Sequence, residues 1–397
     1  MPQKLPFLRV DGTDIVDERG RSVTLRGVAL GGWLMMEGYM MCGRNIPEKV
    51  FKANLARSLG DDAAEDFTRS FRDAFIREDD IRTIRSWGAN LIRIPFNHKV
   101  VDKPGIGYLD RVISWCAKHS IYCILDMHAA PGAQNEDWHA DCVGSPQLFL
   151  RKAHRDKYLR LWRLLADRYK NESAVAGYDI LNEPVVPFTR ERVVKDLYER
   201  ATEVIRKVDA RHIIFQEGNL WAQRLKFLGK PRDNNTAFSV HIYPPVEYVF
   251  NWDLDLKYPC KVAGVLWDRK RLESVVKECS LISERAGVPV YVGEFGVNWR
   301  GGHFGELDWA EDLASLFKKY GFHWTYWTYK TVANSEFPDG LFRYTKNPLW
   351  VNRKGPVTGW ENFYTLWKKE RGNIVDSWST RNFALNTKLL SVLKRYM

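Results

Sequence analysis

Two short stretches decide the interpretation of this chain: Asp179-Ile180-Leu181-Asn182-Glu183-Pro184 and Val290-Tyr291-Val292-Gly293-Glu294-Phe295-Gly296. Each is a run of strand-forming residues that ends in a glutamate at the C-terminal tip of the predicted strand. An ionisable carboxylate is unfavourable at the end of an apolar strand unless it is paired or used. Two such carboxylates together predict acid/base or nucleophile chemistry at a shared site.

Around these stretches, short apolar strands alternate with amphipathic helices, a pattern typical of a parallel α/β fold. Strands are predicted at residues 23–28, 90–94, 122–127, 177–181, 212–216, 237–243, 290–295 and 322–329. Helices are predicted at residues 79–87, 109–119, 152–169, 190–208, 271–286, 309–320 and 386–396, with a short one at 220–228. Eight such units favour one (β/α)₈ TIM barrel domain over residues 1–397. The rival, an open doubly wound sheet, lacks its Gly-rich phosphate turn.

The segments outside this repeat are assigned to the two ends of the barrel. Residues 7–23 predict an N-terminal β-hairpin with Glu18-Arg19-Gly20 at its turn, closing the barrel floor. Long insertions at 29–78, 128–151, 244–269 and 330–385 each follow a strand. They are therefore expected to form enlarged βα loops at the mouth, the catalytic face of such barrels.

The composition limits the classes of protein to which this chain can belong. The chain is 45% hydrophobic and 27% charged, with a net charge of +11. The basic excess is spread along the sequence without a block of five basic residues, which indicates a solvated basic surface and argues against nucleic acid. The apolar runs are strand-sized, so no integral membrane segment is expected. The N-terminus does not resemble a signal peptide, which predicts a cytoplasmic protein, or a secreted one if a leader was removed. Oligomeric state stays open.

Polar residues at the predicted strand ends form a chemically coherent set, because such ends converge on one mouth in a barrel. Two carboxylates can split glycoside cleavage into formation and hydrolysis of a covalent intermediate. Arginine and tyrosine can hold the nucleophile ionised, and a tryptophan offers a flat apolar surface to a sugar ring. The set comprises Arg93, His128, Asn182, Glu183, His241, Tyr243, Glu294 and Trp327.

Six motifs, in order, resemble the signature series of glycoside hydrolase family 5: Arg93-Ile94-Pro95, Asp126-Met127-His128, Asn182-Glu183-Pro184, His241-Ile242-Tyr243, Gly293-Glu294-Phe295-Gly296 and Trp324–Trp327. That family consists of (β/α)₈ barrels, retaining β-glycosidases of clan A that use no metal and no organic cofactor. The resemblance, over residues 26–329, implies that Glu183 is the general acid/base and Glu294 the nucleophile. It also implies a cis peptide bond at Trp327–Thr328. The shell around the −1 sugar would comprise Arg93, His128, Asn182, His241, Tyr243 and Trp327.

Within that family, the opening Arg26-Gly27-Val28-Ala29-Leu30-Gly31-Gly32-Trp33-Leu34 and the stretch Ala130-Pro131-Gly132-Ala133-Gln134-Asn135 are similar to exo-β-1,3-glucanases. This similarity implies that Glu37 binds sugar hydroxyls in a dead-end pocket. The chain departs from those enzymes at residues 136–141, which leaves the sugar open. Asn135, Asp137 and His139 are further candidates for substrate contact.

Asp137, His139, Asp141 and Cys142 also suggest a metal cluster, but their spacing matches no standard zinc or calcium pattern, and sugar contact is favoured. The predicted function is hydrolysis of a β-glycoside or glycoconjugate with retention, exo-acting on a gluco-configured substrate. The same mechanism on a β-galactoside, β-mannoside, furanoside or glycolipid, or endo action, is the alternative. A non-catalytic carbohydrate-binding barrel is the alternative from another class. Retention predicts carboxyl groups roughly 5–5.5 Å apart.

Overall fold

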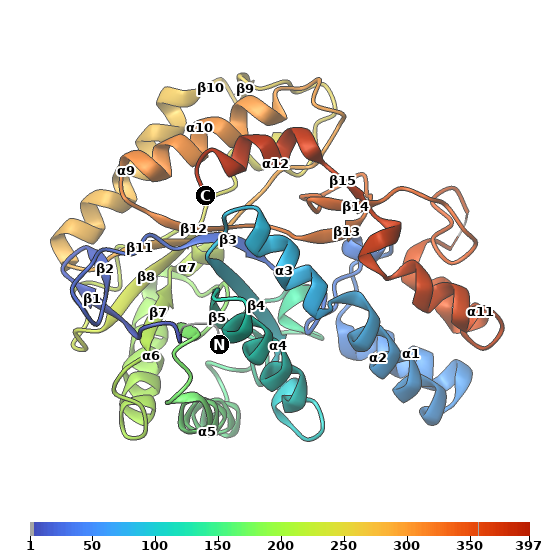
Figure 1. Ribbon diagram of the computed structural model, residues 1–397, viewed down its shortest axis with the longest axis horizontal. Coiled ribbons are helices and arrows are strands. Elements are labelled where there is room, and N and C mark those ends of the chain that lie inside the picture. Colours follow the sequence, from blue (N-terminus) through green and yellow to red (C-terminus); the bar gives the residue numbers. More distant parts are fainter. Residues whose placement is uncertain (1–3, 356) are drawn as a thin grey trace.

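The computed structural model describes residues 4–355 and 357–397. Its centre is a closed barrel of eight strands, all parallel, with helices around the outside (Figure 1). The predicted (β/α)₈ barrel is confirmed, and every predicted barrel strand overlaps an observed one. The strands are β3 (Arg26–Ala29), β4 (Leu91–Asn97), β5 (Tyr122–Ala129), β6 (Val175–Asp179), β7 (Ile213–Glu217), β8 (Thr236–His241), β11 (Val290–Phe295) and β12 (His323–Tyr326).

The outer helices form where apolar residues recur every three or four positions. In α5 (Lys152–Tyr169), which matches the prediction at both ends, Tyr158, Trp162, Leu165 and Tyr169 are buried against the barrel. Such a stripe faces one side of a helix, so it buries on the sheet and leaves the charged side in water. The other outer helices are α3 (Glu78–Ser86), α4 (Ile106–Lys118), α6 (Glu191–Arg206), α9 (Arg269–Ala286), α10 (Glu306–Lys319) and α12 (Thr387–Lys394).

The predicted hairpin at the floor is present, but its turn lies elsewhere. Strands β1 (Leu8–Asp11) and β2 (Asp14–Asp17) pair with Asp11 opposite Asp14, so the turn is Gly12-Thr13, and not Glu18-Arg19-Gly20. A glycine at φ +62° suits this tight two-residue loop. Leu8 and Ile15 pack into a cluster with inward residues of the barrel strands, and so close the floor as predicted.

The helix predicted at residues 220–228 is wrong. The segment α7 (Asn219–Ala222) is a single turn, and Leu220, Trp221 and Ala222 have φ of 54°, 55° and 60°. Three consecutive left-handed residues cannot continue a right-handed helix. The side chain of Asn219 exchanges hydrogen bonds of 2.9 Å with the backbone of Val186. The β7–β8 connection is therefore an ordered, strained turn, where the repeat would place a helix.

Two insertions fold together into a helical lobe beside the barrel, which the sequence had placed in loops. Helices α1 (Glu48–Leu59) and α2 (Asp61–Phe75) come from the first insertion, and α11 (Phe363–Ser377) comes from the last. Figure 1 shows the three side by side. Phe67 is fully buried between them, with Trp367 and Trp378 ring centroids at 4.9 and 5.4 Å.

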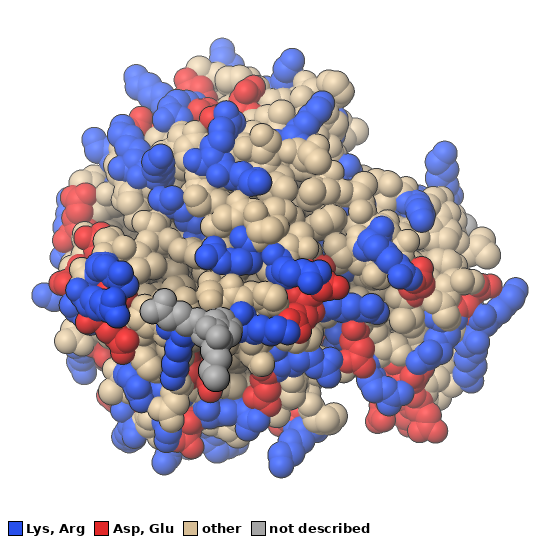
Figure 2. Space-filling model, in the orientation of Figure 1, with Lys and Arg blue, Asp and Glu red and all other residues tan. Residues whose placement is uncertain are grey.

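The remaining elements are short and belong to the loops. They are α8 (Val246–Val249), the hairpin of β9 (Cys260–Val262) and β10 (Val265–Trp267), the sheet of β13 (Lys330–Val332), β14 (Phe342–Tyr344) and β15 (Ala384–Leu385), and 3₁₀ turns at Tyr39–Met41, His98–Val101, Trp138–Ala140, Phe188–Arg190, Gly359–Asn362 and Thr380–Asn382. No helix among the described residues combines the length and apolar character needed to cross a bilayer. On the face in Figure 2, basic side chains are scattered among acidic and uncharged ones.

The lobe yields a prediction about stability. Replacing Phe67 by Ala removes a fully buried ring and leaves a cavity among α1, α2 and α11. We expect the free energy of unfolding to fall by about 3–5 kcal/mol, measured by denaturant titration. Leu164→Ala, on the exposed side of α5, is the control and should change stability by less than about 0.5 kcal/mol. Equal effects of the two substitutions would contradict a packed lobe.

Candidate active site

The two glutamates that opened the sequence analysis meet at the mouth of the barrel. Glu183 follows β6 and Glu294 lies near the end of β11. One side-chain oxygen of each, together with a ring nitrogen of His241, lies within 4.8 Å of the other two atoms. Both glutamates line a cavity of about 440 Å³. The geometry therefore places two carboxylates side by side on one accessible hollow.

Glu294 is held as a carboxylate by its neighbours. Arg93 donates to its Oε1 at 2.5 Å, and the Tyr243 hydroxyl donates to its Oε2 at 2.7 Å. Burial alone would raise the pKa of Glu294, but the charges of His241 and Arg93 hold it below its usual value. Both oxygens thus accept strong hydrogen bonds, which orient the group and favour its ionised form.

Arg93 also binds three acids that sequence reasoning missed. Its guanidinium lies 3.3 Å from Asp179, 3.2 Å from Asp126 and 3.1 Å from Glu217. It further donates to Asn182 Oδ1 at 2.8 Å. All three acids are fully buried inside the barrel. Glu217 could have been found from the sequence, because it is the last residue of β7, much as Glu294 is the last but one of β11.

Glu183 is positioned through its backbone as well as its side chain. Its φ is +47°, in the left-handed region, and its N–H donates to Glu217 Oε2 at 2.6 Å. Its carbonyl accepts from Asn135 Nδ2 at 2.8 Å. Asn135 also accepts from the Asp137 N–H, so this fully buried side chain is engaged by the protein and does not line the cavity. Asn135 supports Glu183 from behind.

Two histidines contact the Glu183 carboxylate. His241 Nδ1 lies 2.6 Å from its Oε1, and His139 Nε2 lies 3.3 Å from its Oε2. Burial alone would raise the pKa of Glu183, but the hydrogen bond and charge of His241, and then the charge of His139, hold it below its usual value. Burial opposes a charge on His139, yet its hydrogen bond with Asp137 and the charges of Glu183 and Asp137 raise the pKa of His139 to about 9.

The four residues that suggested a metal cluster lie in two separate places. Asp137 lies 3.5 Å from His139 and accepts from Trp221 Nε1 at 2.6 Å, at the cavity. Asp141 instead pairs with Lys99 at 2.9 Å, and Cys142 contacts a backbone carbonyl of its own loop. These four therefore do not converge on one point.

Two other trios of described residues have side-chain atoms close enough to hold one metal ion. They are Glu183, His241 and Glu294, and Asp126, Asp179 and Glu217. In the first trio, Glu183 is already bound by His241, and Glu294 by Arg93 and Tyr243. The second trio surrounds the Arg93 guanidinium. A cation already at the centre of the second trio opposes a metal ion there.

Trp327, His128 and Glu37 also line the cavity. Trp327 stacks on His128 with ring centroids 5.5 Å apart, and the Trp327–Thr328 peptide bond is cis, as predicted. Burial lowers the pKa of His128 to about 3, so its ring is neutral. Burial raises the pKa of Glu37 to about 8, and its Oε1 has no hydrogen-bond partner among the described residues. Glu37 thus presents an unused polar atom beside the cavity.

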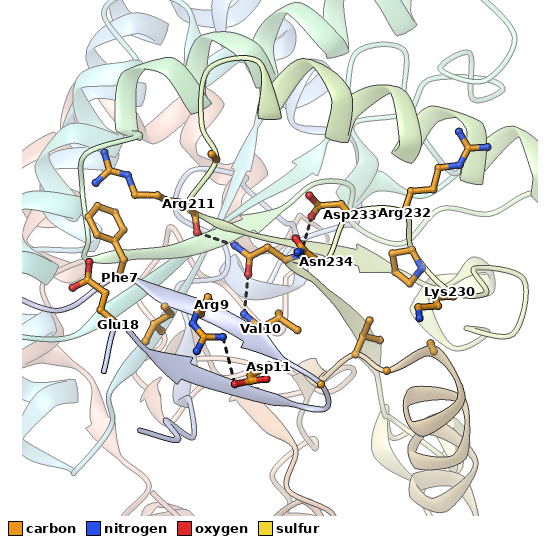
Figure 3. A pocket seen from close by; sticks show the side chains of 18 residues that line it. Phe7, Arg9, Val10, Asp11, Glu18, Arg211, Lys230, Arg232, Asp233 and Asn234 are labelled. Carbon is orange, nitrogen blue, oxygen red and sulfur yellow. Dashed lines mark hydrogen bonds and ion pairs between the residues drawn. The ribbon is translucent and has the colours of Figure 1, made fainter. Parts of the chain in front are cut away.

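The predicted site residues therefore fall into two groups. Those that line the cavity are Glu37, His128, Asp137, His139, Glu183, Tyr243, Glu294 and Trp327. Arg93, Asn135, Asn182 and His241 are buried behind these walls and contact them. A larger hollow of about 730 Å³ lies at the floor, where Val10 bonds to Asn235 (Figure 3), and none of the strand-tip residues lines it.

Comparison with known proteins agrees with this geometry. The family model of cellulase (glycosyl hydrolase family 5) matches residues 62–332. The chain belongs to glycoside hydrolase family 5. It is therefore a glycoside hydrolase, and the resemblance drawn from its motifs is confirmed.

Several relatives of this family 5 enzyme have names that describe different activities. It is 34% identical over 355 residues to a β-xylosidase of Phanerodontia chrysosporium, covering 83% of this chain and 72% of that one. It is 26% identical to endoglucanase C of Acetivibrio thermocellus (67% and 87% covered) and 27% identical to a probable glucan 1,3-β-glucosidase A of Aspergillus fumigatus (58% of each). The crystal structure of endoglucanase Cel5A from Thermotoga maritima superposes with a TM-score of 0.62 at 19% identity, covering 93% and 96%.

The contact between His139 and Glu183 predicts a shift in the pH profile. His139→Asn removes a cation 3.3 Å from Glu183, so the pKa of Glu183 should rise by about 1–3 units. Glu183 then stays protonated to higher pH. We expect the alkaline limb of kcat/KM on an aryl β-glycoside to move upward by a similar amount.

The matched control is His119→Asn, since His119 pairs with Glu78 on the outer helices. It should leave the profile unchanged. An alkaline limb that stays in place or moves downward in His139→Asn would show that His139 does not control the charge of Glu183.

Proposed function

We propose that this enzyme is a retaining, exo-acting β-glycosidase that removes single β-glucosyl or β-xylosyl units, with Glu294 as nucleophile and Glu183 as general acid/base. The observation that carries the proposal is the pair of carboxylates with oxygens within 4.8 Å of one another. Retaining glycosidases hold their carboxyl groups about 5–5.5 Å apart, whereas inverting enzymes need a wider gap for a water molecule.

The first step is attack of Glu294 on the anomeric carbon. Arg93 and Tyr243 keep the attacking carboxylate ionised and aimed at the cavity. As the glycosidic bond breaks, Glu183 gives a proton to the leaving oxygen, and the aglycone departs as an alcohol. The 2.6 Å contact with His241 holds the Glu183 carboxyl group in place for this transfer.

The second step is hydrolysis of the glycosyl ester on Glu294. The charges of Glu183 and Glu294 oppose one another, and ester formation removes the charge of Glu294, which favours ionisation of Glu183. Glu183 then takes a proton from water, and the hydroxide oxygen attacks the anomeric carbon. This releases the sugar with its original configuration and restores the Glu294 carboxylate.

Contacts at −1 follow from the groups with unused hydrogen-bonding capacity. Glu37 Oε1 and Asn182 Nδ2 are buried and lack partners among the described residues. An acceptor and a donor in these positions suit sugar hydroxyls, which otherwise lose hydration when they enter the cavity. Trp327, with its indole Nε1 donating to the Tyr39 hydroxyl at 2.7 Å, supplies the apolar surface for the ring.

Exo action is supported by an aromatic wall across one end of the cavity. Phe337 contacts Trp138 and Tyr39 with ring centroids 5.4 and 5.1 Å apart. These residues come from three different loops, so the wall ties the loops together at the mouth. A wall there opposes passage of a chain through the site. The β-xylosidase and glucan 1,3-β-glucosidase relatives support the same subtype, while the endoglucanase relative supports the alternative of internal cleavage.

The role of Glu294 is tested by covalent trapping. A 2,4-dinitrophenyl 2-deoxy-2-fluoro-β-glycoside should raise the intact mass by one fluoroglycosyl unit, with the label on Glu294 in peptide mapping, because the fluorine slows ester hydrolysis. Glu294→Gln should take no label and lose roughly 10³-fold or more in kcat/KM. Glu336→Gln, an exposed glutamate outside the cavity, is the control and should keep full activity. Label on another residue would overturn the assignment.

Exo action is tested by the first products released from cello-, laminari- and xylo-pentaose. Whatever the rate, we expect only monosaccharide and the shortened tetrasaccharide in the earliest samples, separated by chromatography, if the aromatic wall closes the site beyond the terminal sugar. Disaccharides and trisaccharides that appear together from the start would indicate internal cleavage and refute the exo assignment.

A further inference from the structure

The outer part of the cavity differs in chemistry from its polar floor. Apart from the predicted site residues, Trp221, Val246, Phe250 and Trp252 line the cavity, with Gln223 as the one uncommitted polar side chain near them. The other polar lining group on that side is Asp137, and it is already bound to Trp221 and His139. This apolar vestibule, defined by Trp221, Val246, Phe250 and Trp252, continues outward from the reacting bond.

The vestibule lies on the leaving-group side. The acid that protonates the leaving oxygen must face the aglycone. Trp221 bonds to Asp137, Asp137 contacts His139, and His139 contacts Oε2 of Glu183, so this chain of contacts leads from the acid to the vestibule.

Two aromatic rings of the vestibule are held exposed. Trp221 is 41% exposed and Trp252 is 56% exposed. Trp221 sits in the left-handed turn described above, a backbone arrangement that is unfavourable for residues other than glycine. Asn219 clamps the turn from beneath, and Trp221 Nε1 is pinned to Asp137 at 2.6 Å. The protein thus maintains strain in order to present an apolar ring at the mouth.

We infer that this vestibule binds an apolar alcohol as the aglycone, such as a long-chain alkyl or fused-ring alcohol, in preference to a second sugar. The inference rests on the proposed function, because it takes Glu183 as the acid. A sugar in the vestibule would lose hydration of its hydroxyls with few partners in return, whereas an apolar chain would cover rings that are otherwise in water. The aglycone leaves as the free alcohol after it takes the proton from Glu183.

The test compares ethyl and n-octyl β-glycosides of the same sugar, below the micelle concentration of the octyl compound. Alcohols from ethanol upward have nearly the same acidity, so chain length changes the contacts and leaves the chemistry constant. We expect kcat/KM to be about tenfold or more higher for the octyl glycoside, since each buried methylene contributes up to about fourfold. The corresponding disaccharide (cellobiose or xylobiose) should be a poorer substrate than the octyl glycoside.

Matched variants test whether the vestibule causes the preference for the octyl glycoside. Trp252→Ala should lower the octyl-to-ethyl ratio of kcat/KM about fivefold or more, because it removes one wall of the vestibule. Leu349→Ala removes another exposed apolar side chain, 68% exposed and away from the cavity, and should leave both rates unchanged. Equal kcat/KM for ethyl and octyl glycosides, or a disaccharide that is the better substrate and loses rate in Trp252→Ala, would overturn the inference.

A binding measurement separates this inference from the proposed function. Calorimetric titration with ethyl and octyl 1-thio-β-glycosides, which resist hydrolysis, reports the vestibule without turnover. Tighter binding of the octyl compound, with no hydrolysis of any O-glycoside, would refute the retaining mechanism and support the vestibule. Hydrolysis with equal affinity for both thioglycosides would support the mechanism and refute the vestibule.

Discussion

One buried cation organises this site. Arg93 is fully buried, and its guanidinium contacts Asp126, Asp179, Glu217 and Glu294. One positive charge cannot balance four negative ones in a medium of low polarity. Burial raises the pKa of Asp126 and of Asp179, which favours their neutral forms, whereas the charges of His241 and Arg93 lower the pKa of Glu217 and Glu294. The negative charge is therefore concentrated where it faces the cavity, on Glu294, and on Glu217 beneath it.

The same network couples the two carboxylates. Glu217 contacts Arg93 with one oxygen and accepts the backbone N–H of Glu183 with the other. A left-handed residue such as Glu183 is unfavourable by about 1–3 kcal/mol, and it persists when surrounding contacts fix it. Glu294 and Glu183 are thus positioned by one arginine, through a direct contact in the first case and through Glu217 in the second. The barrel makes this arrangement possible because adjacent parallel strands direct their C-terminal ends to one mouth.

The sequence was sufficient for the parts that depend on local pattern. Strand and helix periods predicted the eight barrel strands, and the residues at strand ends led directly to Glu183 and Glu294. It failed where distant segments decide the structure. Helices α1 and α11 are stabilised by aromatic contacts between positions some 300 residues apart, such as Phe51 with Tyr364. The helix expected at 220–228 was wrong because tertiary hydrogen bonds to Asn219 overrode local propensity.

The acids around Arg93 show a second limit. Asp126 and Asp179 look like ordinary strand residues until the barrel closes and turns them toward the same guanidinium. Asp137, His139 and Asp141 show the converse case. They are close in the sequence, yet Asp141 pairs with Lys99 while Asp137 lies beside His139.

The same contrast between strand ends and loops divides the cavity into a polar floor and an apolar mouth. The two glutamates of its polar floor lie at strand ends, whose positions the barrel fixes, whereas its apolar mouth is built from the β3–α1, β5–α5, β7–β8, β8–α9 and β13–β14 loops. Strand ends can therefore keep the chemistry of bond cleavage while the loops change the group that leaves. Because the aromatic residues of the mouth contact one another across loops, with Phe337 touching both Trp138 and Phe250, a change in one loop would alter the apolar mouth as a whole.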